Sequence, residues 1–206
     1  MGGGGWAALE RAAVAARRAG LLIVADAKRG DVPHTAHAYA AALIGAEGLG
    51  ADAVTVNPLL GRDSLEPWIE AAAATGAGLF ILVRTSNPGA ADLLDLDAGG
   101  APLHERLAAL VAGERRLDGE RGLSGMGAVV GATAVERLVR LRELMPRSIL
   151  LLPGVGAQGA RPEDAAVALG DDPASILVPV SRGIATADDP AQAAASLRDR
   201  LWALRT

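Results

Sequence analysis

Six short apolar runs, each followed by an amphipathic or alanine-rich segment, constrain the fold of this chain most strongly. The runs are rich in Val, Ile and Leu without polar alternation, which is typical of strands buried on both faces of a parallel sheet. They occupy residues 21–25, 53–56, 79–83, 128–130, 149–152 and 176–180. The helical segments are expected at 6–19, 35–47, 64–75, 101–116, 133–145, 162–170 and 190–204. This alternation predicts an α/β fold built on a parallel sheet.

Two architectures fit the alternation, an open doubly wound sheet and a closed (β/α)₈ barrel. A barrel needs about eight strands, whereas six are visible, and the chain opens with a helix rather than a strand. No break in composition divides the 206 residues. We therefore expect one domain over residues 1–206.

Composition excludes several classes of function. The net charge is −4, so the chain has no basic field for nucleic acid or anionic lipid. It contains no cysteine, which removes thiol nucleophiles and thiolate metal sites. No apolar run reaches the length of a membrane span, and the first residues do not resemble a signal peptide. We expect a cytoplasmic protein that binds neither nucleic acid nor membrane.

The strongest chemical signal directly follows the first apolar run, in the segment 26–31, Asp-Ala-Lys-Arg-Gly-Asp. On an extended strand Asp26 and Lys28 point to the same side, in a partly desolvated place, so the carboxylate can hold the ammonium charged as an acid. A plain salt bridge at a strand end is the alternative. Lys28, however, is the only lysine of the chain, and arginine cannot readily give up a proton near neutral pH. The pattern therefore favours proton transfer.

Two further segments indicate a phosphate site. Residues 153–159, Pro-Gly-Val-Gly-Ala-Gln-Gly, form a glycine-rich loop after an apolar run, where free backbone N–H groups favour an anion. Arg182, after the next run, is placed to bind the same phosphate. The glycine spacing also matches a dinucleotide-binding fingerprint, but Ser181 and Arg182 stand where that motif needs an acid.

Two other polar groups are weaker candidates. His34 and His37 have helical spacing for a metal pair, but no third carboxylate ligand is evident. Residues 85–89, Thr-Ser-Asn-Pro-Gly, end the third apolar run and either contact a polar ligand ring or form a turn.

The segment 25–32, with Thr35 four residues after Asp31, resembles the signature of orotidine 5′-phosphate decarboxylases. Further segments resemble the bacterial type 2 branch of that family, in the expected order: 54–61, 84–89, 129–133, 153–159 and 181–184. The resemblance implies a cofactor-free (β/α)₈, TIM-barrel fold that decarboxylates orotidine 5′-phosphate to UMP in pyrimidine biosynthesis. It implies no metal, and a homodimer with shared active sites.

The resemblance also implies a role for each matching residue. Lys28 would donate the proton to C6 of the pyrimidine, with Asp26 beside the departing carboxylate. Asp31 and Thr35 would reach the active site of the partner subunit. The remaining substrate-binding residues would be Ser86 at the base, with Gln158 and Arg182 at the phosphate and Pro153, Gly156 and Gly183 in the same two loops.

The chain departs from the family pattern at its start. Members carry two further βα units upstream, with an aspartate that holds the ribose and a second lysine. A downstream start or fragment, completion by another chain, and a decayed enzyme would each explain the difference. The outer strands, at 21–25 and 176–180, are then expected to expose unpaired backbone and apolar side chains. Two alternative functions stay open: a related magnesium-dependent sugar-phosphate decarboxylase or aldolase, and a non-catalytic phosphate-binding protein.

Overall fold

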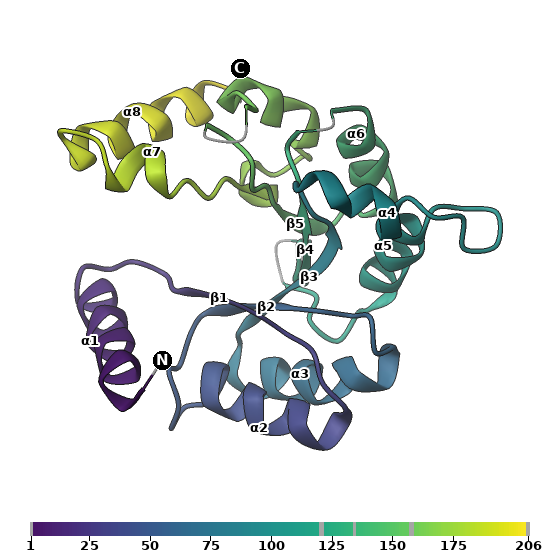
Figure 1. Ribbon diagram of the computed structural model, residues 1–206, viewed down its shortest axis with the longest axis horizontal. Coiled ribbons are helices and arrows are strands. Elements are labelled where there is room, and N and C mark those ends of the chain that lie inside the picture. The colour runs from purple at the N-terminus through teal and green to yellow at the C-terminus, as the bar shows by residue number, and fades with distance from the viewer. Residues whose placement is uncertain (1, 120–121, 134, 157–158, 205–206) are drawn as a thin grey trace. The chain divides into compact units, whose positions relative to one another are not determined.

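The computed structural model describes residues 2–119, 122–133, 135–156 and 159–204 of the chain. The chain divides into two compact units, Met1–Ile81 and Leu82–Thr206, and the boundary between them falls inside the third strand. Figure 1 labels the helices and strands of both units. The expectation of one domain over residues 1–206 stays a prediction, and each unit is described here by itself.

The first unit contains three strands and three helices. They are α1 (Gly3–Arg18), β1 (Val24–Arg29), α2 (Pro33–Ile44), β2 (Ala53–Val56), α3 (Arg62–Thr75) and the start of β3 (Gly78–Arg84). β2 lies between β1 and β3 and pairs in parallel with both. α2 and α3 pack side by side along these strands (Figure 1). Trp68, Val54 and Leu79 are fully buried in the core that results.

The second unit begins with the end of β3 and continues the strand-and-helix alternation. Its elements are η1 (Pro88–Ala90), α4 (Ala91–Leu94), α5 (Leu103–Gly113), β4 (Ser124–Val130), α6 (Val135–Leu144), β5 (Ser148–Leu151), η2 (Pro162–Ala168), η3 (Pro173–Ser175), β6 (Ile176–Leu177), α7 (Arg182–Ala185) and α8 (Pro190–Ala203). β5 pairs in parallel with β4 and with β6. The sheet order follows the order along the chain, as in a (β/α)₈ barrel and unlike a doubly wound sheet, whose strand order reverses.

Arg142 of α6 joins several of these elements at the amino ends of β5 and β6. Its side chain is buried, and it donates hydrogen bonds to the carbonyl oxygens of Ala168, Met145, Ser148 and Ser175 at 2.8–2.9 Å. Burial lowers the pKa of Arg142 to about 10. A single guanidinium thus donates to four buried carbonyl groups, of which that of Met145 also accepts from the Ser148 N–H.

Several expected elements differ from the structure. The first strand was expected at 21–25, but β1 starts at Val24 and extends to Arg29, because β2 begins opposite Val24 and the polar residues continue the pairing. Leu21 and Leu22 precede the strand and are exposed, not buried on two faces. The last strand ends at Leu177 rather than at residue 180. The helix expected at 162–170 is the 3₁₀ segment η2, since the apolar pattern does not distinguish short 3₁₀ from α segments.

Two surface properties were expected from the sequence, the lack of a membrane span and exposed apolar residues on the outer strands. Within the residues that the structure describes, none of the helices combines the length and the apolar character needed to cross a bilayer. At the outer strands, Val24 and Leu177 are exposed, as expected for strands at the ends of the sheet order.

Candidate active site

Asp26 and Lys28 form a direct ion pair on β1. The Lys28 Nζ atom lies 2.5 Å from Asp26 Oδ2, so the two groups meet as expected, although the strand pairing is irregular at this point. The side chain of Asp26 is 59% exposed and that of Lys28 is 50% exposed. In the first unit alone, the ammonium is held by one carboxylate and remains open to a ligand.

Buried Thr55 of β2 completes this cluster and was missed from the sequence. Its hydroxyl accepts a hydrogen bond from the backbone N–H of Lys28 and donates one to Asp26 Oδ1, both at 2.9 Å. The residue lies in the run Ala-Val-Thr-Val, where threonine looks like an ordinary strand former. A single hydroxyl in a fully buried strand, next to a strand that carries acid and amine groups, is the signal that could have identified it.

The segment after Lys28 turns into α2. A side chain at Gly30 would place its Cβ 2.7 Å from the Asn57 carbonyl oxygen, so this close approach of β1 and β2 requires glycine. Asp31 Oδ1 accepts a hydrogen bond from the Val32 N–H at 2.8 Å, just before α2 begins. Thr35 lies one turn inside α2 and is half-buried. The two residues expected to reach a partner subunit thus flank the start of one helix.

Ser86 lies just beyond the carboxyl end of β3, where it packs against the end of β4. A Cβ at Gly131 would come within 2.7 Å of the Ser86 Cα, and the Gly131 N–H donates to the Arg84 carbonyl oxygen at 2.7 Å. A cavity of about 360 Å³ opens beside these residues, and Ser86, Asn87 and Thr133 contribute polar groups to its lining. The placement suits a small polar ring, which is one of the two sequence-based interpretations of segment 85–89.

A network of charged side chains supports the residues next to Ser86. Asp95 accepts hydrogen bonds from Arg84 at 2.8 and 3.2 Å and lies 2.9 Å from an Arg137 nitrogen. The hydrogen bonds from Arg84 hold the pKa of Asp95 below its usual range, although burial acts against them. Arg84 also donates to the Thr85 carbonyl oxygen at 2.5 Å. Arg84, which Asp95 holds in place, therefore fixes the backbone just before Ser86.

The glycine-rich segment after β5 folds into a compact loop. Gly154 and Gly156 have φ angles of 114° and 83°, in the left-handed region that favours glycine. The Gly156 N–H donates to the Ala160 carbonyl oxygen at 2.8 Å. Pro153 begins the loop, and its carbonyl oxygen accepts from the Ala132 N–H. Gln158, expected at the phosphate, lies outside the described residues.

Arg182 and Gly183 lie at the start of α7, shortly after β6. Both are exposed, and within the described part of the chain the Arg182 guanidinium has no hydrogen-bond or ion-pair partner. Because β5 and β6 are parallel neighbours, their following loops lie at the same edge of the sheet. The structure therefore places the glycine loop and Arg182 at one edge of the second unit.

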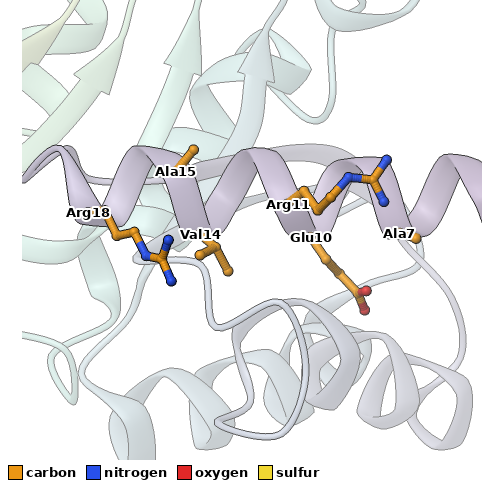
Figure 2. A pocket seen from close by; sticks show the side chains of 6 residues that line it. All are labelled: Ala7, Glu10, Arg11, Val14, Ala15 and Arg18. Atoms are coloured by element: carbon orange, nitrogen blue, oxygen red, sulfur yellow. The ribbon is translucent and has the colours of Figure 1, made fainter.

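Other surface features do not join these groups. Across the described ranges, no three His, Asp or Glu side chains gather as metal ligands would, and His34 and His37 lie exposed on α2. A hollow of about 680 Å³ lies along α1. Figure 2 shows Glu10, Val14 and Arg18 projecting from one side of that helix. All of the residues that line the hollow belong to α1, so it brings together none of the expected site residues.

Comparison with known proteins assigns a family. The model of the orotidine 5′-phosphate decarboxylase / HUMPS family matches residues 3–197. The orotidine 5′-phosphate decarboxylase of Rhodopirellula baltica is 44% identical over 191 residues, which cover 89% of this chain and 63% of that protein. The enzyme of the same name from Haloarcula marismortui is 47% identical over 188 residues, covering 91% and 64%. This chain thus spans less than two thirds of the length of either relative.

A solved structure agrees with the family match. The Leishmania donovani OMP decarboxylase has a TM-score of 0.84 and 38% identity, and the match covers 99% of this chain and 76% of that one. The expected fold, of (β/α)₈ TIM-barrel type with six strands present, is confirmed.

Proposed function

Since this chain belongs to the orotidine 5′-phosphate decarboxylase / HUMPS family, we propose that it decarboxylates orotidine 5′-phosphate to UMP in pyrimidine biosynthesis. The observation that carries the proposal is the Lys28–Asp26 pair, 2.5 Å apart on β1. It supplies an acidic proton on the only lysine of the chain. The relatives that share the motifs are named as decarboxylases of this substrate, which favours it over a magnesium-dependent sugar phosphate.

The chemistry requires a cation at one carbon atom. When the bond from C6 to the carboxylate breaks, CO₂ leaves and the electron pair stays on C6. The Lys28 ammonium stabilises that developing charge and then gives C6 a proton, which forms the C–H bond of UMP. Asp26 lies beside the departing carboxylate and keeps the Lys28 ammonium directed toward C6. Solvent then returns a proton to Lys28, so no metal or organic cofactor is needed.

The remaining substrate-binding residues would bind the parts of the substrate that do not react. Ser86 would contact the pyrimidine, and Gln158, Arg182 and Gly183 would bind the phosphate, with Pro153 and Gly156 shaping the loop beside it. Arg182 is exposed and pairs with none of the described residues, which supports this role because a guanidinium can bind two phosphate oxygens. Phosphate binding far from the reacting bond then contributes to positioning the base.

The test is the ultraviolet absorbance change of orotidine 5′-phosphate with the purified chain. We expect turnover by the unaltered chain and none by Lys28→Ala. Lys28→Arg is the matched control, because it keeps the positive charge but cannot give up the proton near neutral pH. Normal rates in either variant would contradict the role of Lys28, and no turnover by the unaltered chain would contradict the activity. Addition or chelation of Mg²⁺ should leave the rate unchanged.

We also propose a cytoplasmic homodimer in which Asp31 and Thr35 contribute to the partner's active site. Both residues flank the accessible start of α2. Mixing the inactive variants Lys28→Ala and Asp31→Ala should then restore activity, to about a quarter of normal, because half of the dimers are mixed and each has one intact site. A mixture as inactive as its components would contradict shared sites.

A further inference from the structure

The pairing of β1 with β2 is irregular where the ion pair lies. Ala25 pairs with Val54 and Arg29 pairs with Val56, so the three residues 26–28 lie opposite the single residue Thr55. This is a bulge in a parallel pair, where it is rare. It places both Asp26 and Lys28 within reach of one side chain of the neighbouring strand.

The hydrogen bonds in the bulge form a closed ring. Thr55 Oγ1 accepts from the Lys28 N–H and donates to Asp26 Oδ1, each at 2.9 Å. Asp26 Oδ2 accepts from Lys28 Nζ at 2.5 Å. One hydroxyl therefore contacts the backbone of Lys28 and the carboxylate that holds its side chain.

Burial and backbone conformation show which member of the ring is the anchor. Thr55 is 0% exposed and lies between buried Val54 and Val56, whereas the other two side chains are about half exposed. Lys28 has a φ angle of +49° and is the only described non-glycine residue with a positive φ. Such a conformation is disfavoured for a residue with a Cβ and persists only where its surroundings specify it. The bond from the Lys28 N–H to Thr55 is a contact that specifies it here.

We propose that Thr55 is a positioning residue, whose hydroxyl holds the bulge at Asp26–Lys28 and thereby fixes where the Lys28 ammonium lies. The significance for catalysis rests on the proposed function, in which Lys28 is the proton donor. A merely structural threonine would need only its shape, which valine reproduces. The proposal needs the hydroxyl, because only a hydroxyl both accepts from the Lys28 N–H and donates to Asp26.

The chain is well suited to a test that does not require turnover. Lys28 is the only lysine, so labelling with ¹⁵N,¹³C-lysine gives NMR signals from one backbone amide and one side chain. In the unaltered chain we expect the Lys28 amide to exchange with solvent at least about tenfold more slowly than a free amide. Thr55→Val should remove this protection and shift the Cε and Nζ signals. Thr55→Ser, which keeps the hydroxyl, should preserve both.

The outcomes separate this proposal from the proposed function. An unprotected Lys28 amide in the unaltered chain would overturn the positioning role, even if Thr55→Val failed to fold. Unchanged Lys28 signals in a folded Thr55→Val chain, or equal losses in the valine and serine variants, would also overturn it. If the chain turns over substrate, Thr55→Val should lower kcat about 10-fold to 100-fold with little change in KM. Normal turnover by Lys28→Ala would instead refute the proton-donor role and leave the NMR result standing.

Discussion

At β1, Asp26 and Lys28 bind each other and a buried hydroxyl, whereas beyond β5 and β6 the glycine loop bonds to its own backbone and Arg182 binds no described residue. The first region contains the groups assigned to the chemical step, and they are assembled without a ligand. The second contains the groups assigned to the phosphate, and among them Arg182 presents donors that no described residue uses. The difference is what preorganised catalysis requires, because reacting groups gain from fixed positions while binding groups gain from donors that a ligand satisfies.

The largest loss of stability should come from removing the hydrogen bonds of Arg142, which join the starts of β5 and β6. Arg142→Met removes one donor from each of four buried carbonyl groups and should cost about 3–5 kcal/mol of unfolding free energy. Arg140→Met is the matched control on the same helix, since Arg140 is half exposed and pairs with Glu105 on the surface. Denaturant unfolding measures both variants. Equal losses would show that burial does not distinguish the two arginines.

A smaller change should separate binding from stability. Because the Arg182 guanidinium has no partner in the described part of the chain, Arg182→Ala should leave the melting temperature unchanged. It should weaken UMP binding about 10-fold to 100-fold, the usual value of charge-assisted hydrogen bonds to phosphate. Calorimetric titration measures the affinity, with Arg198→Ala as an exposed control on α8. A lower melting temperature of Arg182→Ala with unchanged affinity for UMP would show that Arg182 supports the fold rather than binding phosphate.

A third prediction concerns the close contact between Ser86 and Gly131, which brings together the ends of β3 and β4. Gly131→Ala places a methyl group 2.7 Å from the Ser86 Cα, so the backbone must move, and we expect a loss of about 1–2 kcal/mol. Gly113→Ala, at the end of α5, meets no atom within 4 Å and should change stability little. Thermal unfolding compares the two. A Gly131→Ala chain as stable as its control would mean that the approach of β3 and β4 is loose.

A further effect concerns acid stability away from both regions. The side-chain hydrogen bonds from Arg116 lower the pKa of Glu114 from 4.5 to about 2. A lowered folded-state pKa means that Glu114 stabilises the fold above pH about 4.5 and that this contribution is lost as the pH falls toward 2. Glu114→Gln should flatten the pH dependence of unfolding in that window, with Glu143→Gln as the exposed control. Parallel curves for Glu114→Gln and the unaltered chain would contradict the assignment.

The sequence predicted the strands best where apolar residues decide the pairing. β2 was expected at 53–56 and lies there, because all four of its residues are buried. β1 was misplaced, since hydrophobicity favoured Leu21 and Leu22 while the pairing with β2 begins at Val24. Polar residues such as Asp26 and Lys28 look like loop in a hydrophobic pattern, but a bulge keeps them in the strand.

The site could be predicted as residue types but not as geometry. Lys28 was identified because it is the only lysine, and Asp26 because it lies two residues away along an extended strand. Thr55 escaped notice because its partners lie on another strand, and sequence alone does not reveal the register that brings them together. The exposure of the ion pair also depends on packing rather than on local sequence.

The bulge on β1 contains the reactive residues Asp26 and Lys28, whereas the residues on either side of it pair regularly with β2. With three residues opposite one, the strand contains two more residues than regular pairing with β2 would require. Deleting two residues there would yield a regular strand, without the acid and amine in their present places. In engineering terms, the reactive groups occupy a short insertion that the sheet tolerates, so an unrelated parallel strand with a buried hydroxyl on its neighbour is a candidate host for the same dyad.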